Sequence, residues 1–344
     1  MSKVIDNSTL KEGAPMSVSI ILQQMGVICI LVAIGIYLYK KQVIDDRTSQ
    51  KLSAIVVDVC NPALILGSIL SGHMTATHND LLIAIALGAA FYVILVILGF
   101  VIPRILKSEP YNRKFYNLIT VYTNTGFLGL PIAKAILPAN AILYVIVINI
   151  FYSLFFYTHG MAILHSGIDR ENVRGSEDIN KKTTSNINIV SKHPLLAIFN
   201  IGTMMAVLSL VVFWFEITFP PIISNTIEYV GNATVFMSMT LLGVSIARSN
   251  FFKSFKNIRI WLYIVIRMII VPAVFVAVMY FTGFNTDATL AVCLMAAVPA
   301  GSLPLITAEK MGLDTEILSS SIAMTTFMSV FTITAIMSVV SLLI

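Results

Sequence analysis

Residues 123–131 read TNTGFLGLP and interrupt an apolar stretch that is long enough to cross a membrane. Proline removes a backbone hydrogen-bond donor and glycine weakens a helix, so this stretch disfavours a continuous helix. In hydrocarbon, such a break is tolerated only where it is buried in protein or lines a water-filled cavity. The stretch therefore predicts a broken membrane helix with polar groups at the break.

The composition of the whole chain indicates an integral membrane protein. Of its 344 residues, 57% are hydrophobic and 11% are charged, whereas soluble domains carry roughly 25% charged residues. The net charge of +5 is explained by lysines and arginines in cytoplasmic loops, and no motif for binding nucleic acid accompanies it. The three cysteines lie singly within apolar stretches, a spacing that predicts neither disulfides nor a metal site.

Ten apolar runs reach the length of about 20 residues that a membrane helix needs. The predicted spans are 16–39, 51–71, 81–106, 115–137, 141–165, 194–215, 223–247, 258–282, 287–309 and 316–343. A polar stretch at residues 166–193 has the composition of a flexible linker. It divides the chain into an N-terminal unit, residues 1–165, and a C-terminal unit, residues 194–344, with five spans each.

Lysines and arginines concentrate on one side of the membrane. The loops after the first, third, fifth and seventh spans hold four, four, five and four of them, and Lys310 follows the ninth span. The other side holds only Lys3, Lys11 and Lys134. Because positively charged loops stay in the cytoplasm, we expect both termini outside and the linker inside the cell.

Five spans in each half give the two halves opposite orientations, which is the arrangement of an inverted repeat. Gly126 and Pro131 in the fourth span have the same spacing as Pro299 and Pro304 in the ninth, so one shift along the chain superimposes both pairs. Interrupted helices at matching positions of two inverted halves point to a transporter binding site. The alternative is that these residues only kink their helices, which is common in membranes.

The two breaks could hold an ion or a charged solute without a charged side chain. Helix ends and released backbone groups attract charge, and neutral side chains add donors and acceptors. The candidate substrate-binding residues are Thr123, Asn124, Thr125, Gly126 and Pro131 in the first break, and Pro299, Gly301, Ser302 and Pro304 in the second.

Two ionisable residues lie within predicted spans. Asp58 precedes Asn61 in the second span, and Arg267 lies in the middle of the eighth. A charge at this depth costs at least about 2.5 kcal/mol on insertion scales, which makes each residue a functional candidate. We consider Asp58, Asn61 and Arg267 as coupling or gating residues. Asp58 could take a proton or pair with a buried cation; Arg267 could be that cation, bind an anion, or contact a backbone carbonyl.

Several segments resemble the auxin efflux carrier family, which includes plant auxin exporters and bacterial carriers proposed for malate or malonate. TNTGFLGLPIAKAIL and AVPAGSLPLITAEKMGLDTEILSSSIAMTTFMSV are similar to its two crossover segments, and NPALILGSIL, GNATVFMSMTLLGVSIAR and IRMIIVPAVF extend the similarity. The resemblance implies an all-α homodimer of ten-helix subunits in which broken helices 4 and 9 cross. It also implies a scaffold of helices 1, 2, 6 and 7, with helices 3–5 and 8–10 as a core that moves in the manner of an elevator.

The resemblance implies a role for Asn124, because plant exporters hold their carboxylate substrate through an asparagine shortly before the proline of helix 4. The matching position in the ninth span is Ala297, and the linker is far shorter than in the long plant exporters. These departures favour a compact bacterial carrier of another small molecule. We predict a secondary active transporter, in a bacterial plasma membrane, for a small organic anion such as malate, malonate or an auxin-like acid.

Other functions stay open at this point. They are a sodium-coupled symporter, a carrier of amino acids or other small polar solutes, and a channel or sensor on the same fold. Coupling to protons or sodium is undecided, although neither break contains an acidic residue for a sodium site. No catalytic constellation or nucleotide-binding loop is present, so we predict neither an enzyme nor a cofactor.

Overall fold

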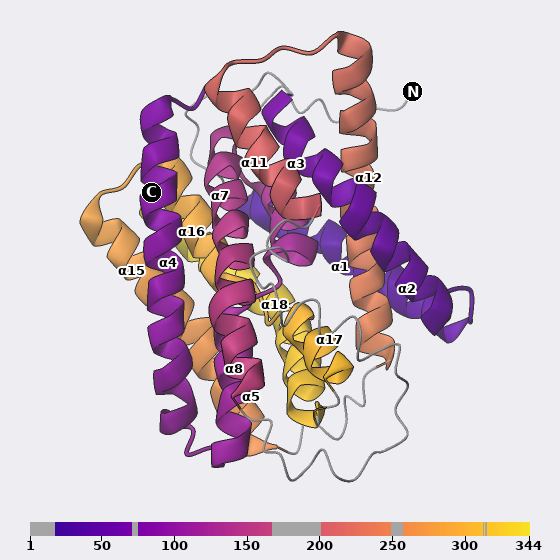
Figure 1. Cartoon of the computed structure of the whole chain (residues 1–344), viewed down its shortest axis with the longest axis vertical. Helices are drawn as coiled ribbons and strands as arrows, with labels where there is room; N and C mark the ends of the chain where they lie inside the picture. Colours follow the sequence, from indigo (N-terminus) through magenta and orange to yellow (C-terminus); the bar gives the residue numbers. More distant parts are fainter. Residues whose placement is uncertain (1–17, 71–74, 167–200, 249–256, 312, 314) are drawn as a thin grey trace.

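The computed structural model describes residues 18–70, 75–166 and 201–248, and residues 257–344 except 312 and 314. The described part is built of helices and contains no strand (Figure 1). Most of the predicted linker, from residue 167 onward, lies outside the described residues. The same holds for residues 194–200 of the predicted sixth span.

Seven helices in the described ranges are long and apolar enough to cross a membrane, so the predicted all-helical membrane protein is confirmed. Three of them combine shorter helical segments. The seven are α1 (Val18–Lys40); α2 (Asp46–Ile55) with η2 (Val56–Cys60) and α3 (Asn61–Leu70); α4 (His78–Ile105); α7 (Ala139–Phe155) with η4 (Phe156–Gly160) and α8 (Met161–His165); α12 (Pro221–Arg248); α14 (Ile258–Ile264) with η6 (Val265–Ile270) and α15 (Val271–Thr282); and α18 (Glu316–Leu343).

The remaining helices are shorter. They are α5 (Pro110–Val121), η3 (Thr125–Gly129) with α6 (Leu130–Ile136), α11 (Ile201–Trp214), α16 (Thr286–Ala297) and α17 (Leu303–Lys310). Helical structure is thus interrupted inside the predicted fourth and ninth spans, at residues 122–124 and 298–302. The count of ten spans and their inverted repeat stay predictions.

Three of the four π-helical turns in the described part end two residues before a proline. The prolines are Pro62 after η2, Pro131 after η3 and Pro272 after η6. A proline ring collides with the carbonyl of the residue four positions earlier and leaves that carbonyl without its helical donor. The wider π turn relieves this conflict while the helix continues.

Helices α1 and α12 pack against each other with very little space between their backbones. A Cβ atom on Gly35 would overlap the carbonyl of Thr240, and one on Gly243 would overlap the carbonyl of Val32. Small residues allow this kind of approach between membrane helices. Helix α12 also contacts α3, and α3 contacts α11, so these four helices form one packed group.

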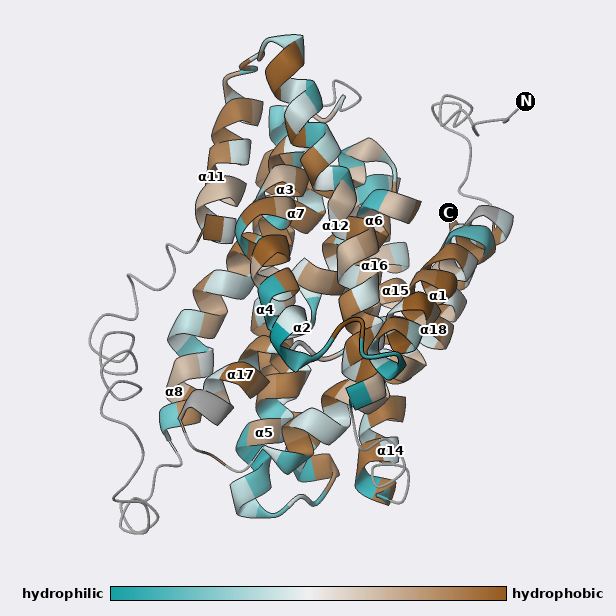
Figure 2. Ribbon diagram, turned by 90° about the vertical axis from the view of Figure 1, so that its right-hand side faces the viewer, coloured by the Kyte–Doolittle hydropathy of each residue, from teal (hydrophilic) through white to brown (hydrophobic). Residues whose placement is uncertain are grey.

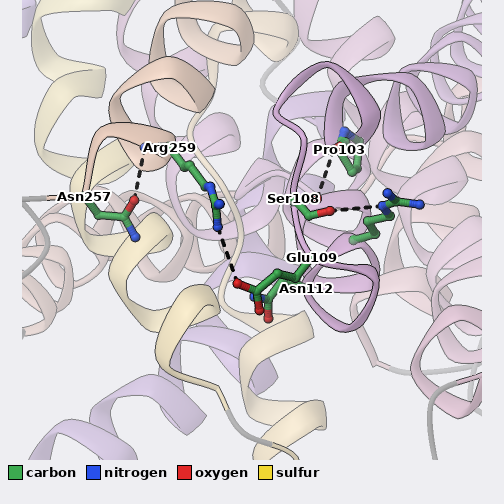
Figure 3. Close-up of polar contacts among 7 residues, drawn as sticks. Pro103, Ser108, Glu109, Asn112, Asn257 and Arg259 are labelled. Atoms are coloured by element: carbon green, nitrogen blue, oxygen red, sulfur yellow. Dashed lines mark hydrogen bonds and ion pairs between the residues drawn. The ribbon is translucent and has the colours of Figure 1, made fainter.

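In Figure 1, α4, α7, α15 and α16 lie to the left of α12, and Figure 2 shows the same helices turned by 90°. Helix α4 packs on α5 and α7, and α16 packs on α7, α15 and α18. At one end, the Arg259 guanidinium lies 3.7 Å from the Glu109 carboxylate and so joins the start of α14 to the start of α5 (Figure 3). Both side chains are largely exposed, so this ion pair contributes little stability.

Candidate functional site

The two breaks meet each other in the structure. The Asn124 N–H donates a hydrogen bond of 2.8 Å to the Pro299 carbonyl, and the Gly301 N–H donates one of 2.9 Å to the Tyr122 carbonyl. Thr123 and Ala300 form the antiparallel bridge between these bonds. Backbone groups that the breaks release therefore satisfy one another, as burial in an apolar environment requires.

The approach of the two breaks requires glycine at position 301. A Cβ atom there would lie 2.9 Å from the Thr123 oxygen and 3.0 Å from the Tyr122 oxygen. Both distances are to backbone atoms, which cannot rotate away. The structure thus gives Gly301 a steric role at the crossing, and its part in binding a substrate stays a prediction.

Asn124 begins the helical segment that follows the first break. Its side-chain oxygen accepts a hydrogen bond of 3.2 Å from the Phe127 N–H, and its carbonyl accepts from the N–H groups of Leu128 and Gly129. Its Nδ2 group donates to no other residue of the described chain. Asn124 is only partly buried, so this amide is free to donate to a solute.

The two threonines beside Asn124 are almost completely buried, each 1% exposed. Their hydroxyl groups have no hydrogen bond of good geometry within the described residues, although the Thr125 hydroxyl lies near that of Tyr92. The first break thus holds polar groups whose hydrogen-bonding capacity is unused. In the second break, Ser302 is partly buried, and Pro299, Pro304 and Gly301 are buried.

Two asparagines from other helices reach the first break. Asn61, at the start of α3, donates a hydrogen bond of 3.3 Å to the Gly126 carbonyl, and its own oxygen is buried without a partner in the described part. The oxygen of Asn149, from α7, lies 3.9 Å from where a Cβ atom of Gly126 would be. Asn149 was not predicted as a site residue, because in the sequence it is a single amide within the largely apolar run VIVINIFYSLF.

Arg267 is completely buried and binds the ends of both interrupted helices. Its Nε donates to the Thr120 carbonyl at 3.1 Å, and its Nη1 donates to the Ala296 carbonyl at 2.7 Å. Thr120 and Ala296 are the next-to-last residues of α5 and α16. Of the roles considered for Arg267, the geometry therefore shows the contact with backbone carbonyls.

Asp58 lies apart from this arrangement. It is exposed on the surface of the chain, in η2, and forms no ion pair with Arg267. Its neighbours Val57 and Val59 are exposed apolar residues. The carboxylate therefore faces the surroundings of this chain from an apolar surface.

Two cavities of about 340 Å³ and 180 Å³ in the described part lie away from the breaks. The larger lies between α1 and α18, and the smaller lies beside the carboxyl ends of α15 and α18.

The structure thus defines an integral membrane protein in which two interrupted helices meet at their breaks. The chain matches the membrane transport protein family over residues 20–337, and it belongs to that family. This finding confirms the resemblance to auxin efflux carriers, and it places the chain in a family of transporters rather than of enzymes. No curated protein matches the chain.

Proposed function

We propose that this membrane transporter carries a small organic anion, such as malate, malonate or an auxin-like acid, and that the anion binds where the two breaks meet. The observation that carries the proposal is that the carboxyl ends of the helices at the breaks have a charged partner, whereas their amino ends have none. The carboxyl ends of α5 and α16 are bound by Arg267. The amino ends of η3 and α17 have no acidic residue in their first turns, so their partial positive charge is left for an anion.

The side chains at the first break suit a carboxylate. The free Nδ2 group of Asn124 donates hydrogen bonds, and the hydroxyl groups of Thr123 and Thr125 can donate as well. Hydrogen bonds to a charged group contribute about 1.5–3 kcal/mol each. These groups carry no charge of their own, so the site can be empty without leaving a buried ion unpaired.

We further propose that the solute crosses by elevator-type alternating access in a homodimer. Helices α1, α3, α11 and α12, which pack together, would be the scaffold, and the helices around the crossing would be the moving core. Asn61 of the scaffold bonds to Gly126 of the core. This bond lies where the two groups would slide, and it must break when the core moves.

Removal of the Asn124 amide is expected to weaken solute binding by about 10- to 100-fold, the equivalent of one hydrogen bond to a charged group. The protein would be reconstituted in liposomes on a solid-supported membrane, and currents recorded on addition of malate, malonate, indole-3-acetate and several amino acids. Asn124→Ala would be compared with wild type and with Asn112→Ala. Asn112 lies in the first turn of α5, at the opposite end of this helix from the break, and its amide donates to Glu109 (Figure 3).

A saturable carboxylate current that is reduced only by Asn124→Ala supports the site. A saturable current that Asn124→Ala leaves unchanged contradicts it. A current with amino acids and none with carboxylates would keep the transporter but reject the anion.

Asp58→Asn is expected to abolish uptake driven by a pH gradient while solute exchange at equal pH continues. A charged carboxylate on an apolar membrane surface is costly, which makes Asp58 a functional candidate. Asparagine has nearly the same shape and does not titrate. Uptake with an unchanged pH dependence in Asp58→Asn would exclude this residue as the proton carrier.

A further inference from the structure

Two negative helix ends meet where the breaks cross. Helix α5 ends at Val121 and α16 ends at Ala297, and the segments that follow them are hydrogen-bonded to each other. The carboxyl end of a helix carries about half a negative charge. Two such ends at one place amount to roughly one negative charge, which needs a cation nearby.

The Arg267 guanidinium supplies one positive charge at that place. It bonds to one carbonyl from each helix, Thr120 and Ala296. These belong to the last four carbonyls of a helix, which have no partner within it. No carboxylate pairs with Arg267 in the described part of the chain, and its Nη2 group is buried there without a hydrogen-bond partner.

This arrangement differs from an ordinary buried ion pair. A fully buried cation costs several kcal/mol unless opposite charge and hydrogen bonds compensate it. Here the compensation comes from two helix ends that are far apart in sequence, 147 and 29 residues from Arg267. The positive charge of Arg267 is therefore compensated only while the carboxyl ends of both α5 and α16 lie at the crossing.

Transporters with broken helices use the same groups to bind a coupling ion. Unwound carbonyls and the carboxyl ends of half-helices coordinate sodium in such proteins. We propose that Arg267 is a built-in counter-cation that occupies the place of a coupling sodium ion at the crossing, and that transport therefore needs no sodium. This inference rests on the proposed function, in that transport passes through the crossing.

The alternative is that Arg267 only holds the helices together through hydrogen bonds. A substitution that removes the charge of Arg267 but keeps a hydrogen-bond donor distinguishes a counter-cation from a purely structural contact. Glutamine at position 267 keeps a hydrogen-bond donor but is neutral, so the negative helix ends would then be uncompensated. If Arg267 stands in for sodium, this variant should acquire a requirement for the ion.

The test measures thermal unfolding of the purified full-length protein while sodium chloride replaces choline chloride at constant ionic strength. Wild type is expected to show no sodium-dependent shift of the unfolding midpoint. Arg267→Gln should unfold at a lower temperature in choline and be stabilised by sodium in a saturable manner, as ligand binding to the folded state requires. Arg259→Gln is the matched control, since Arg259 lies on the same membrane segment with its side chain exposed, and it should show no sodium effect.

Saturable stabilisation of wild type by sodium would overturn the inference. So would an Arg267→Gln protein that is as stable as wild type and indifferent to sodium. If Arg267→Gln cannot be recovered in either salt, Arg267→Lys decides. A stable, sodium-indifferent lysine variant supports a role of the charge, and a lysine variant that fails to fold or responds to sodium opposes it.

The readout needs no transported solute. If no carboxylate gave a current in liposomes, the proposed function would fail while the sodium result still stood. Conversely, a sodium-dependent wild type would reject the counter-cation and leave anion transport at the crossing intact.

Discussion

Replacement of Gly301 by alanine is expected to abolish transport and to lower the free energy of unfolding by about 1–3 kcal/mol, the usual cost of overpacking. The added methyl group would lie 2.9 Å from the Thr123 oxygen and 3.0 Å from the Tyr122 oxygen. To make room, the second break must move away from the first. The hydrogen bonds that join Tyr122 to Gly301 and Asn124 to Pro299 would then lengthen or break.

Gly126→Ala provides the control for stability. A methyl group at Gly126 would meet no atom closer than 3.9 Å, although this glycine lies only a few residues from the crossing. We expect thermal unfolding of Gly126→Ala to resemble wild type, while Gly301→Ala unfolds at lower temperature. Equal unfolding midpoints and intact transport in both variants would show that the close contact at position 301 is not needed.

Gly35→Ala is expected to be the more damaging of two identical substitutions in α1. Its methyl group would overlap the Thr240 carbonyl of α12, so α1 and α12 must separate along the length where they pack. Loss of this contact would expose the facing surfaces to lipid and cost several kcal/mol through lost van der Waals contacts, the main attraction between membrane helices.

Gly26→Ala, in contrast, is expected to raise the free energy of unfolding. No atom lies within 4 Å of a methyl group there, and the residue borders the larger cavity between α1 and α18. Alanine is a better helix former than glycine by roughly 0.5–1 kcal/mol. Thermal unfolding of the purified variants compares them directly, and a Gly35→Ala protein as stable as Gly26→Ala would refute the predicted close packing.

Much of the helical framework could be predicted from the sequence because lipid imposes a simple requirement. Every backbone polar group must find a partner within the membrane, so long apolar runs become helices. For the same reason, Asn124, Gly126 and Pro131 within one run indicated a break. The structure places helix ends near the predicted boundaries and an interruption within that run.

The contacts at the crossing could not be predicted in this way, because they join residues that are distant in sequence. Nothing near Arg267 in the chain indicates that it binds the Thr120 carbonyl, 147 residues away. The spacing of prolines was also only partly informative. The starts of α6 and α17, at Leu130 and Leu303, are separated by the same number of residues as Pro131 and Pro304. The ends of α5 and α16, at Val121 and Ala297, are separated by more residues than that.

The π turn η3 accounts for this difference in offset. It inserts Thr125–Gly129 between the first break and α6, whereas α17 begins soon after the second break. As a result Gly126, which the spacing paired with Pro299, lies inside a helical turn, and the residue that bonds to Pro299 is Asn124. Such a turn depends on the packing around Pro131 and leaves no clear trace in hydropathy.

The antiparallel contact between Thr123 and Ala300 has a mechanical consequence. Two backbone hydrogen bonds and one guanidinium connect four half-helices at the crossing. In the proposed elevator motion, these half-helices would therefore move as one rigid body. A solute held there would keep the same ligands on both faces of the membrane. The intrinsic affinity for the solute would then be similar on the two faces, so loading and release would differ mainly through the solute concentrations there.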